Sequence, residues 1–303
     1  MILYSSNYHC IIHQIETSPM LMAEATLLGI AQDGGRPQPS CQKPCCKDVK
    51  HDEVAFPTSL GLSLADESNH LFDATRNLGE QLKIWGESEP KHVWLTHAHF
   101  GHVDGLGLFG RETIGAKDIK LHVSQKMAEL IHSTPQWSLM LDQGVFEIIP
   151  FQTGDIIQFG AESIEPIIVP HRDELSDMHA FIIRGENKSL LYLPDHDTWE
   201  ETLSSYGCKL IREWFDKLEI DTAFIDGTFW SQHELSGRSQ AEVPHPPVSQ
   251  TIAHLGTKLP GDADVYFIHL NHTNPLYDKS SSAFRTVESM GWKVAVQGMK
   301  ITL

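Results

Sequence analysis

This sequence of 303 residues lacks a long hydrophobic segment and has comparatively few basic residues. None of its apolar runs approaches the roughly 18 residues that a membrane-spanning helix needs, so we expect no membrane partner. Only 23 residues are Lys or Arg, against 40 Asp or Glu, and the formal net charge is −17. Because this excess of negative charge repels phosphate backbones, we expect no nucleic-acid partner. The expected substrate is a small molecule with little or no charge.

The sequence also lacks the cysteine pattern of a disulfide-bonded secreted protein. It has five cysteines, which is an odd number, and Cys45 and Cys46 are adjacent. Such spacing suits free thiols in a reducing compartment, or a metal site, better than a disulfide framework. The first 22 residues contain no continuous apolar stretch of the secretory type. We therefore expect a cytoplasmic protein with a loosely packed N-terminal extension (1–22) and a single domain (23–303).

Short apolar runs alternate along the chain with segments of helical periodicity. Many of the runs are β-branched and bounded by Gly, Pro or Asp, which is typical of buried or half-buried strands. Interspersed strands and helices predict an α/β or α+β domain whose sheets pack between layers of helices. The expected strands are 25–31, 59–65, 92–95, 164–169, 179–184, 189–193, 222–225 and 265–268. The expected helices are 76–86, 124–132, 208–218, 248–255 and 281–290.

Several of the predicted strands run directly into a histidine or an aspartate. Polar side chains just past strand ends are where enzymes built on β-sheets place their chemistry. The loops after the strands are therefore the parts of the sequence that point to function. The residues in question are His97, His171, Asp195, Asp226 and His269.

Three histidines lie close together after the predicted strand 92–95, at His97, His99 and His102. Residues i and i+2 of an extended segment point to the same side, and a third histidine at the start of a helix can close around a metal. Neutral imidazole is a good ligand for zinc and for iron. The pattern alone is suggestive, because unrelated surface histidines could produce it.

The segment LTHAHFGHVDGLGLFGRE resembles the metal motif of the metallo-β-lactamase superfamily, which usually reads His-x-His-x-Asp-His. Further motifs of the superfamily have counterparts in the expected order along residues 25–303. This resemblance implies an αββα four-layer sandwich, in which two mixed β-sheets lie between helices and the metal site lies along one edge. The counterparts are Asp73 in LFDAT, His171 in IIVPHRDE, Asp195 in LLYLPDHD and His269 in FIHLNHTNPL.

Within the superfamily, the sequence is most similar to the pyrroloquinoline quinone (PQQ) biosynthesis protein B group, referred to as PqqB-like. A weaker likeness is to the cyclic phosphodiesterase of the phosphonate pathway. The segments that carry the PqqB likeness are LGIAQDGGRPQ, HFGHVDGLGLFGRE, YLPDHDTW, IDGTFW and HLNHTNPL.

The resemblance also implies the roles of individual residues. Asp195 and His102 would belong to the catalytic centre, and Asp73 would orient the metal-binding loop. Gly101 departs from the motif, because the superfamily has there an aspartate that binds a second metal. Since glycine supplies no ligand and Asp104 is not expected to replace it, we expect one active-site metal: zinc, with iron or manganese as alternatives. The implied ligands are His97, His99, His102, His171, Asp195 and His269.

A second candidate metal site consists of Cys41, Cys45 and Cys46 in a polar loop after the first strand. Thiolates this close together can share one zinc ion. The phosphonate-pathway relatives have a similar cysteine cluster that a histidine completes, and the corresponding residue here is His272. Lys43 stands where those relatives can have a further cysteine. We expect a structural zinc at this site, with a loop of free cysteines as the alternative.

Four residues are candidates for contact with the substrate. His179 follows a polar loop at the start of a predicted strand and could face the substrate or be buried in the fold. Asp226, His245 and Asn271 are candidates on resemblance alone.

The ligand set allows more than one chemistry. Three histidines with an open metal position activate water for hydrolysis, which we favour because His97, His99 and His171 are all present. His102, His269 and Asp195 instead form the two-histidine, one-carboxylate set of iron-dependent oxygenases, a chemistry that PQQ biosynthesis could use. A phosphodiesterase of the phosphonate-pathway type is a further alternative, as is a non-catalytic carrier or binding protein that retains metal only for structure. The sequence does not determine the oligomeric state and leaves a dimer open.

Overall fold

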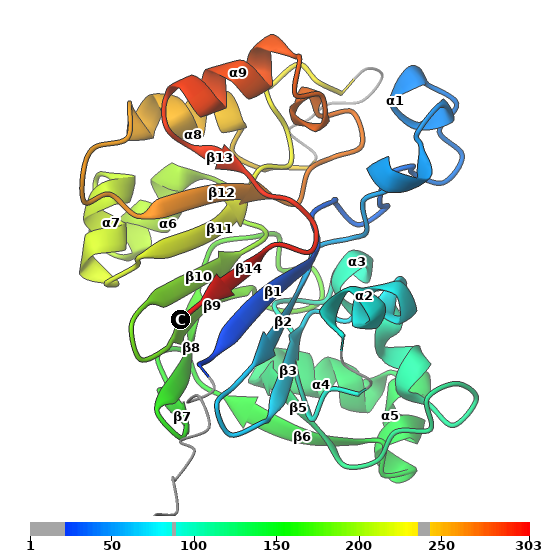
Figure 1. Cartoon of the computed structure of the whole chain (residues 1–303). Helices are drawn as coiled ribbons and strands as arrows, with labels where there is room; N and C mark the ends of the chain where they lie inside the picture. Colours follow the sequence, from blue (N-terminus) through cyan, green and yellow to red (C-terminus); the bar gives the residue numbers. More distant parts are fainter. Residues whose placement is uncertain (1–21, 87–88, 236–242) are drawn as a thin grey trace, which may run out of the picture.

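The computed structural model describes residues 22–86, 89–235 and 243–303. In this part of the chain, two seven-stranded sheets face each other and each sheet has helices on its outer side (Figure 1). The expected αββα sandwich is therefore confirmed. The predicted N-terminal extension lies outside the described residues, except for Met22.

The first sheet is built mainly from the N-terminal half of the chain. Its strand order is β14-β1-β2-β3-β4-β5-β6. Strands β3 to β6 are parallel to one another, while β2 is antiparallel to both β1 and β3. Consequently β1 runs in the same direction as β3 and β4. The bounds are β14 Lys300–Thr302, β1 Glu24–Gly29, β2 Ser59–Ser63, β3 Asn69–Phe72, β4 His92–Trp94, β5 Ile119–Ser124 and β6 Phe146–Phe151.

The second sheet comes from the C-terminal half and has the order β13-β12-β11-β10-β9-β8-β7. Strands β10 to β13 are parallel to one another, whereas the pairs β7–β8, β8–β9 and β9–β10 are antiparallel. The bounds are β13 Lys293–Val294, β12 Asp264–Ile268, β11 Thr222–Asp226, β10 Ser189–Leu193, β9 His179–Arg184, β8 Glu162–Ile168 and β7 Ile157–Phe159.

Helices α2 to α5 lie beside the first sheet and α6 to α9 beside the second (Figure 1). None of the helices in the described residues is long and apolar enough to cross a membrane. The α-helices are α1 Pro44–Lys47, α2 Leu78–Trp85, α3 Phe100–Val103, α4 Gln125–Ser133, α5 Pro135–Asp142, α6 Trp199–Ser205, α7 Ile211–Lys217, α8 Val248–Leu255 and α9 Ser282–Ser289. The 3-10 helices are η1 His51–Glu53, η2 Asp104–Phe109 and η4 Pro275–Tyr277.

All eight expected strands and all five expected helices are confirmed, with ends that differ by a few residues. Strands β3, β5, β6, β7, β13 and β14 and helices α1, α5 and α6 were not among the expected elements. Several of these elements carry polar residues or are very short. Their place in a sheet depends on neighbours that are distant in sequence, which local patterns do not reveal.

The strands are apolar on both faces because each sheet is covered on both sides. On β10, Tyr192 packs in the cluster between the two sheets, whereas Leu191 and Leu193 pack in the cluster beneath the outer helices. On β3, Phe72 belongs to the inner cluster and Leu71 to the helix side. Successive side chains of a strand point to opposite faces, so a continuous apolar run fills both layers.

Candidate active site

The strand directions bring the polar loop residues to one edge of the sandwich. In the first sheet, Asp73 follows β3 and His97 follows β4, and these strands are parallel. In the second sheet, Asp195 follows β10 and His269 follows β12, on either side of the parallel strand β11. The carboxyl ends of parallel strands meet at the same edge, which is where open sheets bind ligands.

The first ligand set consists of His97, His99 and His171, and one nitrogen from each ring lies within 4.8 Å of the others. Nε2 of His97 is 2.8 Å from Nδ1 of His99, and Nε2 of His171 is 3.3 Å from the same Nδ1. His97 and His171 are buried, and His99 is partly exposed. The structure thus brings together all three histidines predicted for this set.

The second ring nitrogen of each of these histidines has its own partner. Nδ1 of His97 is 2.9 Å from Oγ1 of Thr96, and Nδ1 of His171 is 3.0 Å from Oδ1 of Asp197. Nε2 of His99 is 3.2 Å from Oε2 of Glu174. Contacts of this kind fix the ring orientation and the protonated nitrogen of metal-binding histidines. The other ring nitrogens therefore face one common point: Nε2 of His97, Nδ1 of His99 and Nε2 of His171.

His102, His269 and Asp195 form the second set, and the structure adds Asp33 to it. Oδ1 of Asp33 lies 3.5 Å from Nε2 of both His102 and His269. Oδ2 of Asp195 is 3.0 Å from Nε2 of His102 and 3.8 Å from Nε2 of His97. The loop after β1 therefore places a further carboxylate beside the three residues expected for this set. The sequence signal that marks Asp33 is its position shortly after a strand end, which does not show what the side chain contacts.

In the second set, the Nδ1 atoms of His102 and His269 also have neighbouring side chains as partners. Nδ1 of His102 is 2.7 Å from Oδ2 of Asp73, and Nδ1 of His269 is 2.9 Å from Oγ1 of Thr228. Asp73 is fully buried and also accepts hydrogen bonds from Thr96 and Tyr192. It lies behind His102 and does not face the common point. The structure therefore makes Asp73 a positioning residue for His102 rather than one that faces the metal position.

The electrostatics of the cluster favour a bound cation. Burial raises the pKa of Asp195, but the charges of His269 and His102 outweigh this and hold the pKa well below its usual range. Burial lowers the pKa of His102, yet the carboxylates of Asp73, Asp195 and Asp33 raise it well above the ordinary value. Burial, together with His102, lowers the pKa of His97 and keeps it neutral, the form that binds metal.

Two buried atoms of the second set have ion-pair contacts but make no hydrogen bond of ordinary geometry. Among the described residues, neither Oδ2 of Asp195 nor Nε2 of His269 has a hydrogen-bond partner. Buried polar atoms without partners are rare and point to an unseen ion or water. Asp195 and His269 each belong to clusters of three residues whose ligand atoms lie within 4.8 Å of one another. The residues present therefore fit the metal that the ligand set implies.

A cavity of about 1200 Å³ is lined by side chains of α6, α8 and the loops next to these helices, and none of the six candidate ligands is in its lining. Its lining includes Asp197, which contacts His171, and also His245. Nδ1 of His245 is 2.6 Å from Oδ2 of Asp226 and 3.5 Å from Oδ1 of Asp195. The cavity thus reaches the metal-binding groups through these two side chains, and its volume suits a small molecule.

Of the four residues predicted to bind substrate, His245 alone lines this cavity. His179 is buried, with Nε2 2.9 Å from Oγ1 of Thr153. Asp226 is fully buried and holds His245. Asn271 is buried too, and its side-chain amide donates to Thr273. In the structure His179, Asp226 and Asn271 contact neighbouring loop residues and do not line this cavity, so their contact with substrate stays a prediction.

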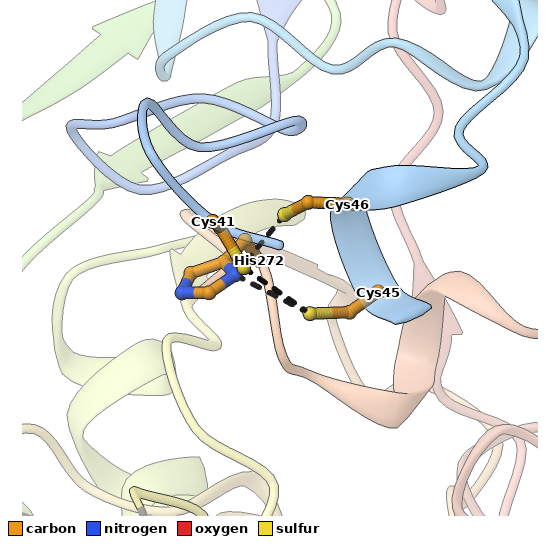
Figure 2. A group of neighbouring side chains, drawn as sticks. All are labelled: Cys41, Cys45, Cys46 and His272. Carbon is orange, nitrogen blue, oxygen red and sulfur yellow. Dashed lines mark hydrogen bonds between the residues drawn. The ribbon is translucent and has the colours of Figure 1, made fainter. Parts of the chain in front are cut away.

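Cys41, Cys45, Cys46 and His272 form a separate cluster, with one ligand atom of each within 4.8 Å of the others. Figure 2 shows the three sulfur atoms gathered around the ring of His272. Nδ1 of His272 is 3.2 Å from Sγ of Cys46 and 3.5 Å from Sγ of Cys45, and the sulfurs of Cys41 and Cys45 are 3.9 Å apart. Three thiols and one imidazole form a donor set typical of structural zinc.

Comparisons with known proteins agree with this geometry. The model of the family described as "Beta-lactamase superfamily domain" matches residues 68–270. The chain is 25% identical to coenzyme PQQ synthesis protein B of Xanthomonas oryzae, over 91% of this chain and 99% of that protein. It is 23% identical to the protein of the same name from Methylococcus capsulatus, over the same shares of the two chains.

Two solved structures share the fold over nearly the whole chain. Zn(2+)-bound PqqB from Methylobacterium extorquens has a TM-score of 0.72 at 17% identity, covering 92% of this chain and 100% of that one. A diphosphatase from the PhnP family has a TM-score of 0.66 at 18% identity, covering 93% and 98%. From the matched family and the histidine-rich edge of the sandwich together, we conclude that this chain belongs to the β-lactamase superfamily and is PqqB-like.

Proposed function

We propose that this protein is a metal-dependent hydrolase acting on a small molecule. The observation that carries the proposal is the convergence of one ring nitrogen each from His97, His99 and His171, while the other nitrogen of each ring is held by a neighbour. A zinc ion bound by three histidines keeps an open position and lowers the pKa of bound water to about 7, which supplies a nucleophile.

The protein's own residues would hold the metal and orient the substrate. Asp195 lies between the two ligand sets and shares its carboxylate with His97 and His102. His245, which Asp226 orients, stands between the cavity and Asp195 and would bind the polar group of the substrate. Although burial lowers the pKa of His245, the charge of Asp226 raises it, so the ring would retain a proton to offer.

Charge and cavity size support a small substrate. The formal net charge of −17 disfavours long polyanions. The cavity of about 1200 Å³ that Asp197 and His245 line has room for a molecule of cofactor-precursor size. We place the protein in the chemistry of PQQ-type cofactor synthesis on the strength of its relatives, which are called coenzyme PQQ synthesis protein B.

A second candidate function is an iron-dependent oxygenase. Asp33, His102 and His269 form a two-histidine, one-carboxylate group, a set that suits Fe(II) with open positions. The metal found in the protein distinguishes the two functions. Protein purified without added metal or chelator should contain zinc in the active site if it is a hydrolase. Iron that is lost in the variants His102→Ala and His269→Ala would favour the oxygenase.

The hydrolase proposal is tested with the zinc-loaded protein and small aryl esters, amides and phosphodiesters. Hydrolysis should depend on zinc and disappear in His97→Ala and His171→Ala. The control is His132→Ala, because His132 is an exposed residue on α4. If no probe is hydrolysed and the protein binds zinc solely through the cysteine cluster, the proposal is wrong.

A further inference from the structure

Gly101 stands where the superfamily motif has a metal-binding aspartate, and the structure shows what fills that space. A Cβ atom at position 101 would lie 2.2 Å from Oδ1 of Asp33 and 2.6 Å from Cα of Asp33. Real Cβ atoms essentially never come this close to other heavy atoms. The loop that carries Asp33 therefore occupies the volume that any side chain at position 101 would need.

The loop is held in this place by hydrogen bonds that link the two sheets. The backbone N–H of Gln32 donates to the carbonyl of Leu270, at 2.9 Å, and the N–H of Leu270 donates to the carbonyl of Ile30, at 2.7 Å. Leu270 directly follows His269. These backbone hydrogen bonds fix Asp33 beside His269. Asp33 also lies within a turn that is closed by a hydrogen bond from the N–H of Gly35 to the carbonyl of Gln32.

The distances within the group fit ligands around a shared ion better than direct hydrogen bonds. Oδ1 of Asp33 is 3.5 Å from Nε2 of both His102 and His269. Hydrogen bonds between nitrogen and oxygen usually measure about 2.7–3.2 Å. Two ligand atoms that bind zinc at about 2.1 Å with a tetrahedral angle lie about 3.4 Å apart. Nε2 of His269, which faces Asp33, is one of the buried atoms without a partner among the described residues.

We propose that Asp33 supplies, from the loop after β1, the carboxylate that Gly101 does not, so that this protein has a second active-site metal position. Its ligands are Asp33, His102, His269 and Asp195, and Asp195 is shared with the first set. Two imidazoles and two carboxylates bind zinc, and they also suit iron or manganese. The inference rests on the proposed function in that both need a metal in this edge of the sandwich.

The position of Asp33 has a consequence for substrate access. The side chain of Asp33 is 39% exposed, whereas those of His102, His269 and Asp195 are at most 2% exposed. The carboxylate therefore forms the solvent-facing side of the second metal position. A substrate that approaches from solvent would meet this metal beside Asp33.

The test is the zinc stoichiometry and affinity of the metal-stripped full-length protein, measured by calorimetric titration with Zn²⁺ alone. The wild type should bind about three zinc ions per chain, two in the active site and one at the cysteines. Asp33→Ala and Asp33→Asn should each bind about one fewer, with unchanged far-UV circular dichroism. Asp104→Asn is the matched control, because Asp104 is the nearest acidic residue of the motif but pairs with Arg76.

Gly101→Ala provides an independent variant. Its new methyl group would displace Asp33 without removing the carboxylate, so it should lose the same zinc ion. A wild type that binds one active-site zinc, or Asp33 variants with wild-type stoichiometry, would overturn the inference and leave the hydrolase proposal intact. If the wild type binds no zinc beyond the cysteine cluster, both fail.

Discussion

Nδ1 of His102 lies 2.7 Å from Oδ2 of Asp73, and Nε2 on the opposite side of the same ring lies 3.0 Å from Oδ2 of Asp195. A carboxylate that never reaches the metal position therefore determines which nitrogen of His102 does. Asp73 has a left-handed backbone conformation, with φ of 60°, which is unusual for a residue other than glycine. Such conformations concentrate at functional sites, where the surrounding structure enforces them.

The first prediction concerns this contact. The Asp73 carboxylate accepts hydrogen bonds from donors that include Thr96 N–H and the Tyr192 hydroxyl. Asp73→Asn places an amide N–H against at least one of them and disturbs the orientation of His102. We expect metal affinity to fall about 10- to 100-fold, as measured by calorimetric titration with Zn²⁺. Asp66→Asn, at an exposed aspartate, is the control. Unchanged affinity in a folded Asp73→Asn variant would contradict this role.

The second prediction concerns the cysteine cluster. Cys46→Ser should lose about one zinc per chain and lower the melting temperature, because a structural zinc contributes binding free energy to folding. The loss should leave the zinc bound by the histidines in place. Elemental analysis and thermal unfolding measure both effects. Cys208→Ser is the matched control, since Cys208 is also buried but lies away from the cluster, with Sγ 3.6 Å from the carbonyl of Tyr206. Equal zinc content in the two variants would rule out the site.

The third prediction separates metal binding from substrate binding at His245. Its Nδ1 contacts Asp226 and lies 3.5 Å from Asp195, so it is close to the metal groups without being assigned to either set. We expect His245→Gln to retain the wild-type zinc content and to raise the KM for any substrate that the zinc-loaded protein hydrolyses. Zinc titration and steady-state kinetics on the same samples decide this. A loss of zinc would make His245 a ligand instead.

The fourth prediction concerns acid stability and a buried histidine of the first sheet. Burial, with smaller effects of His92 and Lys120, lowers the pKa of His122 to about 3. The unfolded chain takes up a proton near pH 6.5 and the folded chain does not, so this histidine makes stability fall as pH drops from about 6.5 towards 3. The loss amounts to about 1.4 kcal/mol per pH unit.

His122→Phe should reduce this slope. Phenylalanine can keep the stacking of ring 122 on Trp94, where the centroids are 3.8 Å apart, while it removes the titrating group. Denaturant unfolding of wild type and variant between pH 6 and pH 4, at equal metal loading, gives the difference in slope, about 1.4 kcal/mol per pH unit. His132→Gln, at an exposed histidine, should leave the slope as it is. An identical slope for His122→Phe would disprove the prediction.

The sequence by itself determined the layered fold and most of the candidate metal ligands. Apolar runs such as 189–193 are continuous because both faces of each sheet are buried, so they were recognisable as strands without any knowledge of their neighbours. His97, His99 and His102 are close in sequence and needed no long-range information. His171, Asp195 and His269 were found because each ends an apolar run.

Tertiary structure alone decided which other side chains complete or support the site. Asp33 reaches His102 and His269 because β1 runs in the direction of β3 and the loop after it pairs with Leu270, across the interface of the sheets. No local sequence pattern shows that Asp33 fills the space that a side chain at position 101 would need. Similarly, His179 and Asn271 follow or precede strands as functional residues do, but packing buries them. Which polar side chain faces the metal is set by contacts between segments far apart in sequence, and these exist only in the folded chain.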